Sequence, residues 1–263
     1  MARHSNGESV FSRVARIFEG FDPEHSALTV SELSERTGIP LPSTSRMVAE
    51  MIEYGWLCRD ADKRVRVGMR IWELVARAAP VNELRAAALP VMTDLLGRAG
   101  RHVHLSIRAG REVLCVERLS APGAIPDRTT TVGGRSPLPV SAPGLVLLAH
   151  APAGLREAVL AAPLPAIAGE PVTDPNALRR LLSEIRHTGV AHCPGILDPA
   201  VTALAVPVRA AGGSTVAALS VALPATAAIP PMVPPLRAAG ARIGRALGDH
   251  GPVRVGLPDT LTA

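Results

Sequence analysis

The segment TVSELSERTGIPLPSTSRMVAEMIEYGWLCRDADKRVRVG, residues 29–68, carries two helical patterns followed by two short extended ones. In its first ten residues Val30 and Leu33 form an apolar stripe, and Gly38 is a typical C-terminal stop for a helix. Pro42 suits the first turn of a second helix. The apolar residues of that second helix recur at helical spacing: Met47, Val48, Met51 and Ile52. The segment therefore predicts two helices joined by a short linker.

A hairpin is predicted directly after these helices. The extended pieces GWLCR (55–59) and RVRVG (64–68) flank the turn DADK (60–63). Another amphipathic helix precedes the segment, and a further one starts at Ile71. The apolar face of the preceding helix comprises Val10, Val14, Ile17, Phe18 and Phe21. Helix, helix, short turn, helix and hairpin is the winged helix-turn-helix pattern.

In this pattern the third helix enters the major groove, and its N-terminal end meets the base edges. That end carries Ser43, Thr44, Ser45 and Arg46. The apolar residues of the same helix are predicted to be core. The segment therefore predicts packing on one side of the helix and DNA contact at its start.

The aromatic residues divide the chain. All six precede position 73, and the 263 residues exceed the usual size of one domain. We place a domain boundary at Ala79-Pro80, which gives a winged helix-turn-helix domain with a linker helix at 1–79. A sensor domain is expected at 80–250 and a C-terminal tail at 251–263.

The formal charge of +5 does not by itself locate a nucleic-acid surface. Residues 1–77 hold eleven basic and eleven acidic side chains, although 59–70 alone holds five basic against two acidic. No apolar run is long enough for a transmembrane helix, and MARHSNGESV has no signal-peptide core, so we expect a cytoplasmic protein without membrane contact. The three cysteines are scattered and predict neither a disulfide framework nor zinc-finger spacing.

The second part of the chain has strand and helix patterns. HVHLSIR (102–108) with REVLCVERL (111–119), and TALAVPVRA (202–210) with STVAALSVAL (214–223), predict two antiparallel hairpins. The piece NALRRLLSEIRHTG predicts an amphipathic helix between them, and the Pro/Ala-rich 224–235 predicts a loop. The pattern predicts an α+β fold. His102, His104 and Ser106 are predicted to lie on a solvent-facing side of their strand.

These motifs together resemble the IclR family of bacterial transcription regulators, from about Phe11 to Arg245. Besides 28–74, the resemblance rests on GGRSPLPVSAPGLVLLA and on the 174–225 region. It implies a winged helix-turn-helix domain followed by a GAF-like α/β effector domain with an antiparallel sheet. It also implies a homodimer or homotetramer that binds a palindromic double-stranded DNA operator and responds to a small molecule. No cofactor is implied.

The resemblance also assigns DNA-contacting residues. Arg46 matches the recognition-helix arginine of the family, where it binds a guanine or a phosphate. The alternative for Arg46 is an ion pair with Glu50 one turn on. Lys63 and Arg64 fall in the wing, where the alternative is a solvated turn.

By the same resemblance, the effector site should comprise Arg128, Leu138, Ser141, Ala142, Gly144, Cys193, Ala203 and Ser220. The sequence departs from the family pattern here: the acidic residue at Cys193 and the glutamate at Ile196 are absent, and Pro143 lacks a backbone N–H. Because no Phe, Tyr or Trp follows Trp72, we expect an aliphatic pocket and a compact aliphatic effector. Arg128 would be the partner of a carboxylate. Further wall residues are expected to be Ile125, Val132 and Leu204.

Other functions remain open at this point. His102 and His104, with His192 and Cys193, suggest a metal site, but histidines two apart on a strand are more often surface residues, and no metal is predicted. No acid, base or nucleophile has catalytic spacing, so no enzyme is predicted. A winged helix can instead bind a protein. A regulator whose effector pocket binds nothing is the other alternative.

Overall fold

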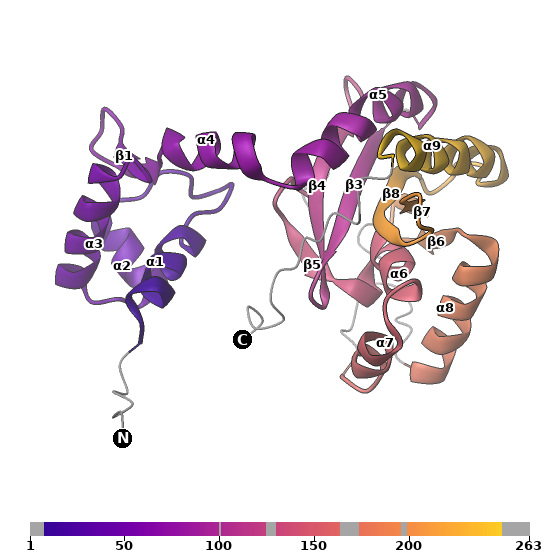
Figure 1. Cartoon of the computed structure of the whole chain (residues 1–263), viewed down its shortest axis with the longest axis horizontal. Helices are drawn as coiled ribbons and strands as arrows, with labels where there is room; N and C mark the ends of the chain where they lie inside the picture. The colour runs from indigo at the N-terminus through magenta and orange to yellow at the C-terminus, as the bar shows by residue number, and fades with distance from the viewer. Residues whose placement is uncertain (1–7, 100, 125–129, 164–173, 196–198, 249–263) are drawn as a thin grey trace. The chain divides into compact units, whose positions relative to one another are not determined.

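The computed structural model describes residues 8–99, 101–124, 130–163, 174–195 and 199–248. The chain divides into two compact units, Met1–Ala79 and Pro80–Ala263, at the same position as the predicted boundary. In Figure 1 the first unit is indigo to purple, and the second runs from purple to yellow. In the described ranges, no helix combines the length and hydropathy needed to span a membrane.

The first unit has the predicted winged helix-turn-helix order. Its elements are α1 (Val10–Glu19), α2 (Val30–Thr37), α3 (Leu41–Glu53), β1 (Leu57–Arg59), β2 (Val65–Val67) and α4 (Met69–Ala78). Thr29 and Glu32 form a capping box at the start of α2, and Gly38 ends α2 in the left-handed conformation with φ 65°. Strands β1 and β2 pair antiparallel as the wing.

The core of the first unit joins the three helices to the wing. Its buried side chains include Ile17 from α1, Leu33 from α2, Val48 from α3 and Val65 from β2. The backbone of Leu28 also bridges to Val65, so the wing is attached to the segment before α2. Helix α4 is different, because none of its residues is buried.

The second unit is built on a six-stranded antiparallel sheet of order β5-β4-β3-β8-β7-β6. Its strands are β3 (His102–Ala109), β4 (Glu112–Ser120), β5 (Arg135–Pro137), β6 (Ala191–Pro194), β7 (Val201–Arg209) and β8 (Thr215–Pro224). Its helices are α5 (Val81–Ala99), η1 (Leu138–Val140), α6 (Ala142–Ala149), α7 (Ala153–Leu160), α8 (Pro175–Thr188), η2 (Pro230–Met232) and α9 (Val233–Ala246). Both predicted hairpins, β3-β4 and β7-β8, and the predicted helix α8 are confirmed.

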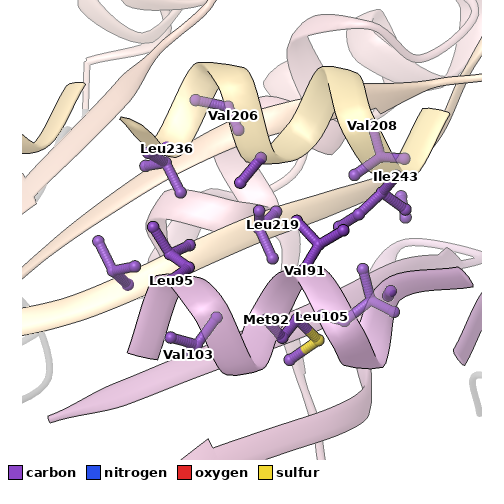
Figure 2. Packing of buried hydrophobic residues seen from close by; sticks show 14 of the residues in the cluster. Val91, Met92, Leu95, Val103, Leu105, Val206, Val208, Leu219, Leu236 and Ile243 are labelled. Carbon is purple, nitrogen blue, oxygen red and sulfur yellow. The ribbon is translucent and has the colours of Figure 1, made fainter. Parts of the chain in front are cut away.

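Helices cover both faces of this sheet (Figure 1). Helices α5 and α9 pack on one face of the sheet. The buried cluster there contains side chains of α5 and of the sheet (Figure 2): Val91, Met92 and Leu95 from α5, and Leu105 and Leu219 from the sheet. Helices α6, α7 and α8 belong to a second core on the opposite face. We call the face beneath α6 the inner face.

Three sequence predictions differ from this structure. His102, His104 and Ser106 are buried rather than solvent-facing, because the side of β3 that carries them is the inner face and is covered. Residues 224–235 are only partly loop, since they contain η2 and the first turn of α9. Helix α5 starts two residues after Ala79, where the helical pattern was expected to stop, and its alanines and internal Pro90 obscure its periodicity.

Candidate functional site

The N-terminal end of α3 presents only part of the predicted DNA-contacting set. Ser45 and Arg46 are exposed, and Ser43 is half-buried. The Thr44 side chain is fully buried, and its hydroxyl donates to the carbonyl oxygens of Ile39 at 3.0 Å and Pro40 at 3.3 Å. Thr44 therefore ties α3 to the turn before it, and the structure corrects its assignment as a surface contact.

Arg46 is available to a ligand. In the described part of the chain it has no carboxylate within 4.0 Å and no hydrogen bond from its guanidinium, and the alternative ion pair with Glu50 is not formed. An exposed guanidinium without an internal partner keeps all its donors for a guanine edge or a phosphate.

Arg64 has an internal role that the sequence did not predict. Its guanidinium donates to the carbonyl of Ala27 and to the carboxylate of Glu32, both at 3.1 Å. Glu32 also accepts from the backbone N–H of Thr29 at 2.6 Å. The bonds from the Thr29 backbone and side chain, followed by the Arg64 charge, hold the pKa of Glu32 below its ordinary 4.5. Arg64 thus joins the wing to the start of α2.

The wing turn is held by Asp60. This carboxylate accepts from Arg66 at 2.8 Å and from the backbone of Arg64 at 3.0 Å, and the bond from Arg66 is the main cause that lowers its pKa below 3.8. Lys63 stands exposed at the turn with φ 61°. Of the basic residues predicted for DNA contact, Arg46 and Lys63 therefore point most freely to solvent.

Cross-strand pairing places the predicted effector residues of the sheet side by side. One row across the inner face joins His102, Ala222, Ala203 and Cys193 on β3, β8, β7 and β6. The next row joins His104, Ser220, Ala205 and Ala191. Directly paired residues share a face, so these small side chains and two imidazoles form one surface.

The corner between η1 and α6 packs on the same face. Leu138 and Ala142 share a buried cluster with Cys193. Ser141 caps α6 by accepting from the N–H of Gly144 at 3.3 Å. A Cβ on Gly144 would lie 2.0 Å from the carbonyl oxygen of Leu138, so only glycine permits this close corner.

Other predicted site residues lie elsewhere. Leu204 is wrong as a wall residue, because it points to the α5 and α9 side of the sheet. Val132 is exposed. Arg128 and Ile125 lie outside the described residues. Arg128 therefore stays a prediction as the carboxylate partner.

The inner face contains polar groups that the sequence assigned to solvent. His102 and His104 are buried with their ring centroids 6.0 Å apart, and Nδ1 of His102 lies 2.9 Å from the Ser120 hydroxyl. Within the described ranges, no group of three or more His, Cys, Asp or Glu side chains could hold a metal ion. Burial raises the pKa of the Cys193 thiol to about 12, which keeps it neutral. The alternation of His102, His104 and Ser106 identifies one side of β3 in the sequence, but alternation alone does not show that this side is buried.

Two family models match the chain. The IclR helix-turn-helix domain matches residues 11–61, and the C-terminal domain of the bacterial transcriptional regulator IclR matches residues 76–240. The chain is also 34% identical over 160 residues to the HTH-type transcriptional regulator KipR of Bacillus subtilis. That match covers 60% of this chain and 62% of KipR, so it spans less than two thirds of that relative.

Solved structures give matches over nearly the whole chain. An IclR homolog from Microbacterium hydrocarbonoxydans, in complex with 4-hydroxybenzoate, is 40% identical with a TM-score of 0.86, over 91% of this chain and 99% of that one. An IclR homolog from Microbacterium sp. strain HM58-2 is 39% identical with a TM-score of 0.60, over 91% and 98%. These families and relatives are regulators, in agreement with the prediction that the chain is not an enzyme. The chain belongs to the IclR family of bacterial transcriptional regulators.

Proposed function

We propose that this protein binds a palindromic DNA operator as a dimer and that a small carboxylic acid at the inner face of its second unit modulates the binding. The observation that carries the DNA-binding part is the exposed start of α3, where Arg46 has no carboxylate partner among the described residues. A third helix of this fold places its N-terminal side chains against base edges, and the wing adds backbone contacts. Lys63 supplies a charge at the wing tip.

The dimer is supported by an uncovered apolar helix. Met69, Trp72 and Val75 of α4 are 69%, 62% and 48% exposed, and α4 buries none of its own residues. Large apolar side chains grouped on one helix are typical of a protein interface. A second copy of the chain is the proposed partner, because a palindromic operator requires two recognition helices related by two-fold symmetry.

The effector class follows from the inner face. The sequence predicts a compact aliphatic effector, since the unit lacks Phe, Tyr and Trp. The buried imidazoles of His102 and His104 nevertheless offer planar groups on the face that carries Ser220. These residues make an aromatic acid a second candidate, which the 4-hydroxybenzoate complex of the Microbacterium relative also favours.

The first experiment is a titration of the protein against the DNA flanking its own gene by fluorescence anisotropy at several salt concentrations, with a scrambled duplex as control. A regulator should prefer its own flank, and its affinity should fall as salt rises because phosphate neutralisation releases counterions. Binding that is equally weak for both duplexes would point to a distant operator. No binding even at low salt would favour a winged helix that docks a protein.

The effector is tested by thermal unfolding with 4-hydroxybenzoate and with a short aliphatic acid. A ligand that binds only the folded protein raises Tm. The Ser220→Ala variant should reduce the rise, whereas Ser183→Ala on α8 serves as a matched serine control. A pocket that binds nothing would leave Tm unchanged with both acids, which would remove the effector from the proposal without touching the DNA-binding result.

A further inference from the structure

A hollow of about 770 Å³ lies in the second unit, between the end of β7 and α9. Its polar lining consists of three arginines, Arg209, Arg237 and Arg245. Its remaining lining is apolar or small: Gly189, Val206, Pro207, Ala210, Ala211, Ala241, Gly244 and Gly248. We call it the arginine groove. None of the predicted effector residues lines it.

Two glycines of α9 create this groove. A Cβ on Gly244 would lie 2.2 Å from the carbonyl oxygen of Arg209, and one on Gly240 would lie 2.9 Å from Val206. The helix therefore lies directly against β7, beyond the point where β6 stops pairing with it at Ala205. This contact places Arg209 of β7 beside the helix that carries Arg237 and Arg245.

Among the residues that the structure describes, no carboxylate neutralises the charges of these arginines. Arg209 donates to Nε2 of His150 at 2.9 Å, and Nδ1 of His150 lies 2.9 Å from the carbonyl oxygen of Val146. Burial, followed by the charges of Arg209 and Arg186, lowers the pKa of His150 below 6.5, so the imidazole is a neutral acceptor. Arg209 is thus oriented by a partner that carries no charge.

The other two arginines also lack a carboxylate partner among the described residues. Arg237 donates to the carbonyl oxygen of Thr188 at the end of α8, and Arg245 stands in the last turn of α9. Helix C-termini favour a cation there, but their partial charge of about half a unit does not cancel a guanidinium. Among the described residues, no carboxylate lies within 4.0 Å of Arg209, Arg237 or Arg245.

We infer that the arginine groove is a second ligand site, for a small phosphate monoester. A phosphate monoester carries a charge of about −1.5 to −2 near pH 7 and three acceptor oxygens, which suits several guanidinium groups at once. The hollow has the size of a small-molecule pocket, and its apolar lining suits the organic part of such an ester. The site is independent of the proposed effector at the inner face.

The test is isothermal titration calorimetry of the full chain with phenyl phosphate, with phenol as the neutral analogue. Phenyl phosphate should bind and phenol should not. Arg237→Gln and Arg245→Gln should each weaken binding about tenfold or more, because a hydrogen bond to a charged group contributes roughly that factor. The matched control is Arg180→Gln on α8, which removes one exposed arginine outside the groove.

Equal loss in Arg180→Gln would mean attraction to overall charge, and would overturn the site. So would the absence of binding in the unmodified chain. Asp249, which follows Gly248 in the sequence, lies outside the described residues, and Asp249→Asn is therefore included. Binding that appears only in Asp249→Asn would assign the groove to the chain's own carboxylate, and would also overturn the proposal.

Discussion

A single glycine sets the corner at which α6 meets the inner face. Because a Cβ at Gly144 would lie 2.0 Å from the Leu138 carbonyl oxygen, the Gly144→Ala variant must displace backbone. We expect it to lower the free energy of unfolding by about 1–3 kcal/mol, as overpacked cores do. Chemical denaturation of the full chain measures this loss.

The control for that variant is Gly154→Ala in α7, where an added Cβ meets nothing within 4 Å. It should be neutral or stabilising by up to about 1 kcal/mol, because glycine is a poor helix former. If Gly144→Ala were as stable as Gly154→Ala, the close contact at the α6 corner would be wrong.

Arg46 is the side chain that we expect to contact the operator DNA. Arg46→Ala should weaken operator binding by about 1–3 kcal/mol if the guanidinium binds a guanine, and should relax specificity at that base pair. Anisotropy titration with the operator and single-base variants checks both effects, with circular dichroism to confirm folding. A folded variant that keeps full affinity would remove Arg46 from the interface.

At the scale of elements, the capping box stabilises the start of α2. Thr29→Ala removes the hydroxyl that accepts from the Glu32 N–H at 3.2 Å, and we expect a cost of about 1 kcal/mol. Thr29→Ser keeps the acceptor and should retain most of that stability. Denaturant melts of the two variants side by side measure the difference.

The stabilisation that Glu32 gives through Thr29, and to a smaller extent through Arg64, should depend on pH. The pKa of Glu32 is lowered on folding, so its contribution is present above the ordinary value of 4.5 and is lost as the pH falls through the lowered value. Glu32→Gln should flatten this acid-side loss of stability, measured as Tm against pH. The exposed Glu35→Gln, also on α2, is the matched control. An equal acid-side slope in Glu32→Gln and the unmodified chain would contradict the lowered pKa of Glu32.

At the scale of the whole molecule, self-association is the main expectation. Trp72→Glu places a charge on the exposed apolar residues of α4 and should weaken a dimer by at least about 2 kcal/mol, since buried tryptophans are frequent hot spots. Sedimentation velocity across a dilution series measures it. The control is Tyr54→Glu, another exposed aromatic residue but on the C-terminal side of α3. An unchanged dimer in Trp72→Glu would assign the interface to another surface.

Local signals determined the first unit. Amphipathic spacing, a capping residue, a glycine stop and a hairpin turn each act within a few residues, so α1 to α3 and the wing could be predicted from the chain alone. The hairpins of the second unit were predictable for the same reason. Helix α6 gave no such signal, because it is buried all round and has no polar face to set a period.

The sequence by itself therefore determined the winged helix, the two hairpins and the exposed arginine of α3. Only the tertiary structure decided that Thr44 faces inward, that Arg64 binds Glu32, and that His102 is buried. It also brought together the three arginines of the groove. The physical reason is that propensity and periodicity act between near neighbours, whereas burial and pairing depend on which distant segment covers a face.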